Sequence, residues 1–316
     1  MRQSDVMVYL MTGFLDSGKT QFLTFTLEQD YFQIQGKTLL ILCEEGEEEY
    51  DPKEMLKYGV VIEKVEDKED LTEAWLEEMN RKHKPERVVV EYNGMWPVSD
   101  FEKLALPAGW KIEQKIATVD ASTFQMYLTN LKPLFVEMVK GAELVLFNRC
   151  EDRGPLAGYR RSVKVVSPQA EVIFEDENGE VDNIFEDEVP YDLNAPVIEI
   201  RREDYGIWYV DMMENPDRYK GKVVEFVAKV MKPRAFPSKV FLPGRTAMTC
   251  CADDMRYYGY PCKMEEKIEI QKNQWVKVRA RFEFEPLVYE DSRQPVLHLI
   301  SLEPTEKPEE EIVYLG

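Results

Sequence analysis

Two glycines, a lysine and a threonine stand close together near the start of the chain, in the stretch TGFLDSGKTQFL. Gly13, Gly18, Lys19 and Thr20 match the spacing GxxxxGK[ST], in which backbone N–H groups cradle phosphates. An apolar, strand-like run, VMVYLM, precedes the stretch and a helical pattern follows it, which is the context that the motif requires. The stretch therefore predicts a loop that binds the phosphates of a nucleotide.

The chemistry of such a loop assigns roles to its side chains. Lys19 is expected to reach the β- and γ-phosphates and to act in catalysis, and the Thr20 hydroxyl is expected to bind Mg²⁺. The N-terminus of the following helix adds its positive dipole end. We also expect Asp16, Ser17 and Gln21 to belong to the nucleotide site.

Further residues narrow the class, because the chain resembles the CobW-type P-loop GTPases, a group that includes metallochaperones and metal-insertion proteins. Their first loop typically reads TGFLGSGKT, and this chain differs only at Asp16. An inward carboxylate would lie against the triphosphate and weaken its binding. Asp16 is therefore expected to face solvent or to partner a cation or another chain segment.

The stretch CEEGEEEYD resembles the family's NEFGEVGID, with Glu44, Gly46 and Glu47 in register and Cys43 in place of Asn. The resemblance implies a switch region that senses the γ-phosphate and Mg²⁺, and it adds Glu44 to the expected Mg²⁺ ligands. A charged loop that merely follows a strand remains the alternative.

The stretch VVVEYNGMWP resembles the family's hhhExxG…P element. A carboxylate at the end of a parallel strand can reach the Mg²⁺ water shell, and a glycine there can present its N–H to the γ-phosphate. The resemblance thus implies Glu91 as a catalytic and Mg²⁺-binding residue and Gly94 as a nucleotide-binding one.

The stretch AELVLFNRCED resembles the guanine-recognising NKxD box. Asn148 matches, Arg149 replaces Lys, and Glu151 stands in place of Asp; a shift of one residue would bring in Asp152 instead. SPQAEVI, which starts at Ser167, resembles the family's NPxAxI segment near the base. The resemblance implies GTP rather than ATP, with an ATP-using kinase as the alternative.

The CxCC motif that such proteins carry before a DLxxAL helix start is missing here, because GVVIEKVEDKE, before DLTEAW, holds no cysteine. The inherited thiolate site for zinc is thus absent from this domain. Cys250, Cys251 and Cys262 form the one thiol cluster of the sequence, and Cys251 and Cys262 could bind zinc with His298. Adjacent side chains of a strand point to opposite faces, so packing of these thiols is the alternative.

The alternation of apolar strands with helical patterns predicts two domains. Residues 1–195 are expected to form an α/β P-loop NTPase domain, a mostly parallel sheet with helices on both faces, ending in an acidic linker at 174–195. Residues 196–316 are expected to form a small, antiparallel, OB-like β-barrel domain. The part from 217 to 304 resembles the soluble domain of YcgQ-type bacterial proteins, which pair with predicted permeases. The predicted strands are 6–11, 37–43, 87–92, 115–120, 143–148, 170–174, 223–230, 245–251, 274–285 and 295–302, and 123–140 is predicted to be helical.

Charge and composition limit the partners. The net charge is −20, and residues 1–200 carry 21 Lys and Arg against 40 Asp and Glu. Such an acidic surface disfavours binding to nucleic acid and to anionic membranes. No apolar run approaches the roughly 20 residues that span a bilayer, and the start of the chain lacks the pattern of a signal peptide. A cytoplasmic protein with five reduced cysteines is expected.

Together these features predict a GTP-binding switch with slow, Mg²⁺-dependent hydrolysis, roughly 10⁻⁴ to 10⁻² s⁻¹ without a partner. Its partner would be a metal-requiring client or a membrane permease, and its context metal homeostasis or transport. Two alternatives are a metallochaperone that uses the C-terminal cysteines and a non-hydrolysing, nucleotide-gated adaptor for a transporter.

Overall fold

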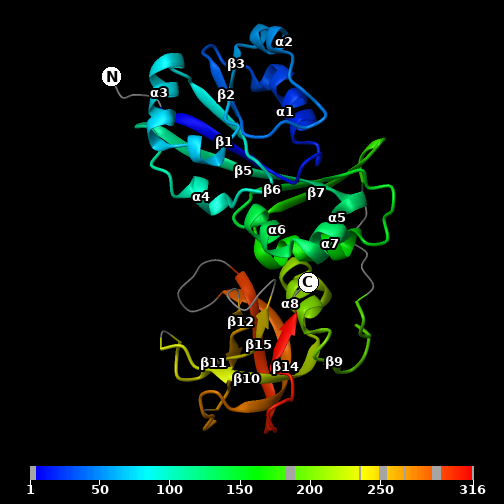
Figure 1. Ribbon diagram of the computed structural model, residues 1–316. Helices are drawn as coiled ribbons and strands as arrows, with labels where there is room; N and C mark the ends of the chain where they lie inside the picture. The colour runs from blue at the N-terminus through cyan, green and yellow to red at the C-terminus, as the bar shows by residue number, and fades with distance from the viewer. Residues whose placement is uncertain are drawn as a thin grey trace. The chain divides into compact units, whose positions relative to one another are not determined.

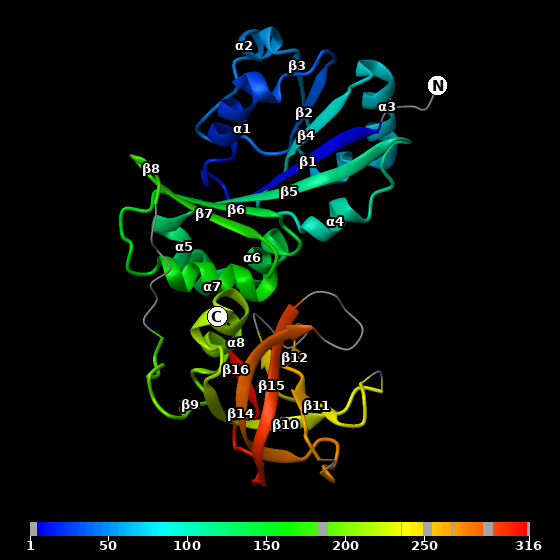
Figure 2. The same ribbon diagram turned by 180° about the vertical axis from the view of Figure 1, so that it is seen from behind.

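The computed structural model describes residues 5–181, 189–234, 236–248, 255–266, 268–286 and 293–314. The chain divides into two compact units, residues 1–184 and 185–316. This division falls inside the acidic segment that was predicted as a linker. Each unit is built around its own sheet (Figures 1 and 2).

The first unit contains a mostly parallel sheet. Its strands are β1 (Val6–Thr12), β2 (Thr38–Leu42), β3 (Val60–Lys64), β4 (Arg87–Glu91), β5 (Trp110–Asp120), β6 (Leu144–Asn148), β7 (Glu171–Asp176) and β8 (Gly179–Glu180). They lie in the order β3-β2-β4-β1-β5-β6-β7-β8, and in the described part only the β7–β8 pair is antiparallel. The carboxyl ends of β1, β2, β4 and β6 therefore meet at one edge of the sheet, which is where the predicted site residues follow the strands.

Helices connect these strands. They are α1 (Lys19–Glu28), α2 (Pro52–Lys57), α3 (Glu73–His83), α4 (Val98–Glu102), α5 (Ala121–Asn130), α6 (Lys132–Val139) and α7 (Leu156–Val166), with short 3₁₀ turns at Asp30–Phe32 and Lys68–Asp70. A single helix was predicted for residues 123–140, and this prediction is wrong in one respect. The segment forms two helices, α5 and α6, that meet at Leu131. Pro133 explains the break: it lies in the first turn of α6, where a missing N–H is tolerated.

Two hydrophobic cores lie on opposite faces of the sheet. Along β2, Leu39 and Ile41 pack into the core beneath α3 to α7, while Leu40 and Leu42 pack into the core beneath α1 and α2. All four side chains are buried. Burial on both faces is what a near-continuous apolar strand requires, and the arrangement confirms the predicted fold class of this unit.

The second unit is a mostly antiparallel barrel. Its elements are β9 (Ile198–Ile200), α8 (Tyr205–Glu214), a 3₁₀ turn at Pro216–Arg218, β10 (Val223–Met231), β11 (Val240–Met248), β12 (Arg256–Gly259), β13 (Cys262–Lys263), β14 (Trp275–Pro286), β15 (Arg293–Pro304) and β16 (Ile312–Tyr314). The ring β10-β14-β15-β13-β11 closes because β11 also pairs with β10. Closure removes the free edges of these strands, as in the OB-like barrel that was predicted. None of the helices in the described ranges has the length and apolarity needed to span a bilayer.

The aromatic cluster around Phe124 offers a test of the first unit's core. The Phe124 ring is fully buried and lies 4.8 Å from the Phe135 ring, 5.2 Å from that of Phe147 and 4.6 Å from that of Tyr159. We expect Phe124→Ala to lower the free energy of unfolding by about 3–5 kcal/mol, because it leaves a cavity. Phe25→Ala, at a ring that is 61% exposed, is the matched control and should stay within about 0.5 kcal/mol of the parent. Urea unfolding measures both changes, and equal effects would contradict this packing.

Candidate nucleotide-binding site

The predicted phosphate loop lies between β1 and α1. Gly18 has a φ of +89°, a left-handed conformation that glycine adopts without strain, and α1 begins at the next residue. The Ser17 N–H donates to the Phe14 carbonyl at 3.2 Å. The buried Ser17 hydroxyl lies 2.9 Å from the hydroxyl of Thr118, which anchors the loop to β5. The strand, loop and helix thus have the arrangement in which backbone N–H groups and a helix N-terminus face an anion.

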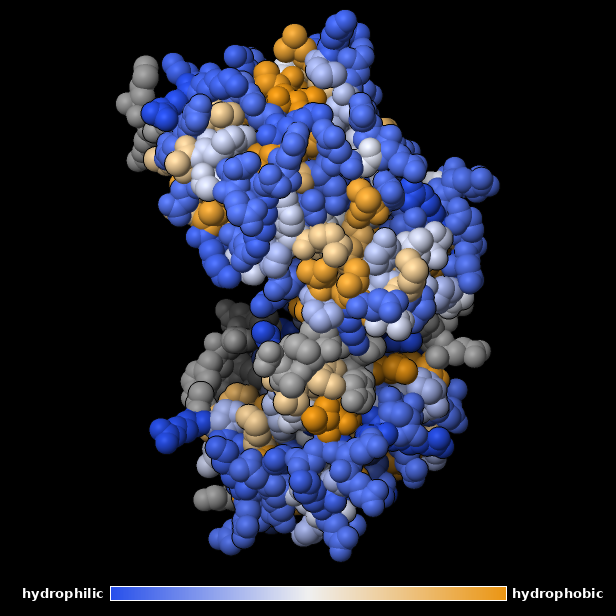
Figure 3. Space-filling model, viewed as in Figure 1, coloured by the Kyte–Doolittle hydropathy of each residue, from blue (hydrophilic) through white to orange (hydrophobic). Residues whose placement is uncertain are grey.

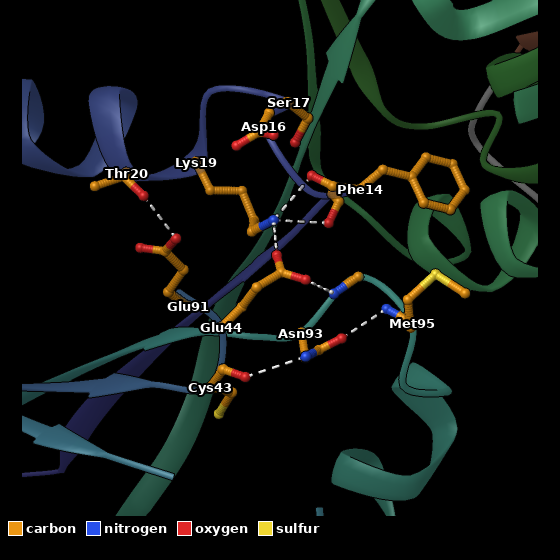
Figure 4. A network of polar contacts seen from close by, with 12 residues as sticks. Phe14, Asp16, Ser17, Lys19, Thr20, Cys43, Glu44, Glu91, Asn93 and Met95 are labelled. Atoms are coloured by element: carbon orange, nitrogen blue, oxygen red, sulfur yellow. Dashed lines mark hydrogen bonds and ion pairs between the residues drawn. The ribbon is translucent and has the colours of Figure 1, made fainter. Parts of the chain in front are cut away.

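Lys19 points back into this loop (Figure 4). Its ammonium group is buried and donates to the carbonyls of Gly13 and Phe14, each at 2.9 Å. It also lies 2.5 Å from Oε2 of Glu44, which follows β2. A buried ammonium needs such partners, because desolvation without a counter-charge is costly.

The Glu44 carboxylate bridges two elements that were predicted to bind the terminal phosphate. One oxygen contacts Lys19, and the other accepts the Gly94 N–H at 3.3 Å. Gly94 must be a glycine at this place, because a Cβ atom there would lie 2.4 Å from the Gly13 carbonyl oxygen. The Glu44 carboxylate therefore accepts hydrogen bonds from the Lys19 ammonium and from the Gly94 N–H at the same time.

Glu91 ends β4 and is buried. Its Oε1 accepts the Thr20 hydroxyl at 2.9 Å, and its Oε2 accepts the Tyr50 hydroxyl. Burial is the main cause that raises the pKa of the Glu91 carboxyl above its ordinary value, against the hydrogen bonds that favour its charged form. The structure brings Thr20 and Glu91 together as a pair of oxygen donors, the kind of ligand that Mg²⁺ prefers. Glu44, the third expected ligand, forms an ion pair with Lys19 in this structure.

Asp16 partners another chain segment. Its φ of +57° is left-handed, and its exposed carboxylate accepts the Glu47 N–H at 3.5 Å. It therefore touches the loop after β2. Gln21 is exposed on α1.

The loop after β2 forms one wall of the site. The hollow beside Lys19 and Thr20 has a volume of only about 80 Å³, and Glu44, Gly46 and Glu48 contribute to its wall. Small-molecule pockets usually start at about 300 Å³. The hollow beside the loop is therefore smaller than the pockets that usually hold a small molecule.

The end of β6 carries the predicted base-recognising residues. Asn148 Nδ2 donates to the Ser17 carbonyl at 2.8 Å, and its Oδ1 is buried without a hydrogen-bond partner among the described residues. Arg149 donates to the Asp16 carbonyl at 2.9 Å and lies 2.6 Å from Asp120 Oδ2. Glu151 is exposed in the following loop. Asn148 and Arg149 are thus next to the phosphate loop, while Glu151 makes no described contact with it.

The expectation for Ser167 is wrong. The Ser167 hydroxyl is buried, accepts the Gly141 N–H at 2.9 Å and donates to the Ala142 carbonyl at 3.5 Å. These groups precede β6, at the amino ends of the strands. Ser167 therefore lies at the sheet edge opposite to Asn148 and away from the base, where it joins the end of α7 to the start of β6.

The described thiols are all buried. Burial raises the pKa of Cys43 and Cys262, and it raises that of Cys150 to about 11. Each thiol is therefore neutral near pH 7 and packs rather than reacts. Cys250 and Cys251 lie outside the described residues.

The predicted meeting of Cys262 with His298 does not occur. Cys262 pairs in register with Leu297 and both side chains are fully buried, whereas His298 pairs with Lys263. His298 therefore points to the opposite face, where its Nε2 lies 2.9 Å from Glu285. Within the part of the chain that the structure describes, no group of three or more His, Cys, Asp or Glu side chains is placed to hold a metal ion.

Three residues at the site were not predicted from the sequence. The Tyr50 hydroxyl donates to the Glu91 carboxylate, and the Thr118 hydroxyl contacts that of Ser17. The Asp120 carboxylate forms an ion pair with Arg149. Of these three residues, Asp120 alone could have been predicted from the sequence, because it is a polar residue at the carboxyl end of a parallel strand. Tyr50 and Thr118 could not, because their roles depend on contacts across about 40 and 100 residues.

Two family models match the sequence of the chain. The family described as "CobW/HypB/UreG, nucleotide-binding domain" matches residues 7–174, and the one described as "DUF1980 C-terminal domain" matches residues 177–315. No curated protein sequence matches the chain.

Two of the solved structures that are similar to the chain are the following. The hydrogenase maturation factor HypB from Archaeoglobus fulgidus is 18% identical, with a TM-score of 0.40, over 55% of this chain and 82% of that one. Zn(II)-bound YjiA GTPase from E. coli is also 18% identical, with a TM-score of 0.42, over 77% of this chain and 86% of that one. The family match covers more than half of the residues: the chain belongs to the CobW/HypB/UreG family of nucleotide-binding domains and continues into a DUF1980 C-terminal domain.

Proposed function

We propose that this protein is a GTP-dependent switch in which the terminal phosphate replaces the Glu44 carboxylate. One observation carries the proposal: Glu44 is bound by the Lys19 ammonium and the Gly94 N–H at the same time. These are the two donors that a P-loop protein of this family would offer to a γ-phosphate. GTP therefore expels Glu44, and the loop from Cys43 to Asp51 moves with it.

The proposed Mg²⁺ ligands are the Thr20 hydroxyl and the Glu91 carboxylate, directly or through water. A bound Mg²⁺ would neutralise charge on the β- and γ-phosphates. The two side chains already share a hydrogen bond of 2.9 Å, so their oxygens are close enough to contact one ion. Nearby positive charge lowers the pKa of a carboxyl, so metal binding offsets the cost of burying Glu91 in its charged form. Tyr50, in the loop after β2, links metal binding at Glu91 to this loop, because its hydroxyl donates to the Glu91 carboxylate.

Hydrolysis is proposed to be slow. Arg149, an arginine beside the phosphate loop, is committed to Asp120 and to the Asp16 carbonyl. No general base is assigned among the described residues of the site. Turnover of roughly 10⁻⁴ to 10⁻² s⁻¹ is typical of unassisted GTPases. A partner that supplies the missing groups would then set the lifetime of the GTP form.

Metal handling is the proposed context, because metal homeostasis fits the CobW/HypB/UreG family. The acceptor would be a metal-requiring client or a permease, and we place the protein in the cytoplasm. Guanine selection is assigned to the segment from Asn148 to Glu151, with Asn148 nearest to the phosphate loop.

Lys19→Ala tests the nucleotide site. Removing the ammonium should weaken GTP binding by at least about 100-fold, because charge-assisted contacts to the phosphates are lost. Titration of a fluorescent GTP analogue, with competition by GTP, GDP and ATP, measures the effect. Lys37→Ala, at an exposed position between the 3₁₀ turn at Asp30–Phe32 and β2, is the control and should bind as the parent does. Unchanged affinity in the folded Lys19→Ala protein would disprove the proposal.

Glu44→Gln tests the exchange of anions. The substitution removes the carboxylate that competes for Lys19 and Gly94, so GTP affinity should rise about tenfold while GDP affinity changes less than about twofold. A hydrogen bond to a charged group is worth about 1.5–3 kcal/mol, which is at least a factor of ten. Glu45→Gln, at an exposed carboxylate paired with Lys64, is the control and should alter neither affinity. A loss of Mg²⁺·GTP affinity in Glu44→Gln would instead make Glu44 a metal ligand.

Glu91→Gln tests the buried carboxyl through the pH dependence of stability. The folded-state pKa of Glu91 is raised mainly by burial, so its ionisation destabilises the nucleotide-free protein. This penalty is absent below the ordinary pKa of about 4.5 and grows as pH rises through the folded-state value. The unfolding temperature of Glu91→Gln minus that of the parent should therefore increase from pH 4.5 to pH 8. Thermal melts without nucleotide measure the difference, and a decrease over that range would refute it; Glu45→Gln should show none.

A further inference from the structure

A groove of about 720 Å³ runs along the outer edge of the first sheet. We call it the edge groove. Its floor is β3, and its sides come from the loop after β2, from α2 and from the end of α3, where Lys82 and His83 lie. Neither the nucleotide nor its Mg²⁺ is expected to reach it, so the proposed function leaves it unexplained.

The edge groove opens on the free side of β3. Val60 and Ile62 face the core beneath α2, whereas Val61 faces the opposite core, yet all three line the groove. A groove lined by both faces of one strand must follow the edge of that strand. In the described part, β3 pairs with β2 alone.

The backbone of β3 offers hydrogen bonds on that side. The Gly59 carbonyl accepts the Thr38 N–H, and the Val65 N–H donates to the Leu42 carbonyl. Because bonds alternate along a parallel ladder, the N–H and C=O of Ile62 point away from β2 and into the groove. A free edge of this kind is a template for an additional strand.

The edge groove is apolar in the middle and acidic on one side. Leu56 of α2 is 63% exposed, and Figure 3 shows hydrophobic surface where α2 and β3 lie. Glu48 and Glu49, from the loop after β2, line the groove without an ion pair to any residue that the structure describes. At the other end, Lys82 and His83 are both engaged by Glu63. The uncompensated charge of the groove is negative.

We propose that the edge groove binds an extended segment of a partner protein, in which apolar and basic side chains alternate, as an added strand on β3. Its backbone would pair with the free edge at Ile62, its apolar side chains would cover Leu56, and its Lys or Arg side chains would meet Glu48 and Glu49. A second copy of this chain is a poor occupant, because each copy carries a net charge of −20 and they repel one another.

Docking in the edge groove is linked to the nucleotide site by shared residues. Glu44 and Tyr50 line the groove, and they also contact Lys19 and Glu91 respectively. Anything that draws Glu44 off Lys19 therefore reshapes a groove wall. This linkage rests on the proposed function, whereas docking itself does not.

The test uses the full chain and a fluorescein-labelled six-residue peptide of alternating valine and lysine. Fluorescence anisotropy in low salt, without nucleotide, should show saturable binding. A peptide of alternating valine and glutamate should bind at least about tenfold more weakly, since like charges then face Glu48 and Glu49. The lysine peptide with N-methyl groups on its two central residues should lose a similar factor, because both of its hydrogen-bonding edges are blocked. Equal binding of all three peptides would overturn the proposal.

The protein-side variant is Glu48→Lys/Glu49→Lys, which should weaken the lysine peptide at least about tenfold. Glu77→Lys/Glu78→Lys makes the same charge change on exposed α3 positions outside the groove and should stay within about twofold. Equal losses in both variants would show mere attraction to an acidic surface and overturn docking in the groove. Self-association abolished only by the first variant would assign the groove to a second copy and likewise overturn it.

A non-hydrolysable GTP analogue separates the two proposals. If both hold, saturating analogue changes the peptide's Kd, and the peptide changes the analogue's Kd by the same factor. If the analogue does not bind, the proposed function fails while peptide binding stands by itself. If the analogue binds and the peptide does not, docking fails and the switch stands.

Discussion

The buried ammonium group of Lys19 is the constraint on which the rest of the first unit depends. Its position beneath the phosphate loop follows from the turn at Gly18 and from the start of α1 at Lys19 itself. Two loop carbonyls satisfy two of its donors, and its positive charge still requires an anion. Glu44 supplies that anion from the loop after β2, so the lysine fixes where this loop lies.

One acidic loop consequently serves several parts of the molecule. Glu44 contacts Lys19 and Gly94, the Glu47 N–H contacts Asp16, and Tyr50 contacts Glu91. Each of these partners is a residue at or beside the phosphates' proposed place. The outer surface of the same loop faces the edge groove. The loop is thus held at the site through three of its residues, Glu44, Glu47 and Tyr50.

Much of this could be predicted from the sequence, where local chemistry decides the outcome. The phosphate loop and the positions of Glu91 and Gly94 at strand ends follow from spacing, strand patterns and family resemblance, and the fold class follows from strand–helix alternation. The contact between Glu44 and Lys19 could not be predicted, because the resemblance implies only a Mg²⁺-binding role for Glu44 and the contact joins two residues that are 25 positions apart. The strand β3 was missed because VVIEK is short and half exposed. Ser167 was predicted near the base but lies at the opposite edge of the sheet. A short motif shows which residues are adjacent in sequence, and it does not show at which edge of the sheet they lie.

The proposed exchange of anions at Lys19 would give the protein a way to distinguish nucleotides by the terminal phosphate. GDP lacks that phosphate, so under the proposal it would bind while Glu44 still contacts Lys19 and Gly94. GTP would first have to shift the equilibrium to the form in which Glu44 has left Lys19, and its apparent affinity would be reduced by the fraction of the protein in that form. The contacts that hold the loop at the site would thus lower GTP affinity and, by the same free energy, couple GTP binding to the position of the loop. A tighter loop would give a sharper switch and weaker GTP binding, and a looser one the reverse. Under the proposal, the strength of the Lys19–Glu44 contact would set that compromise.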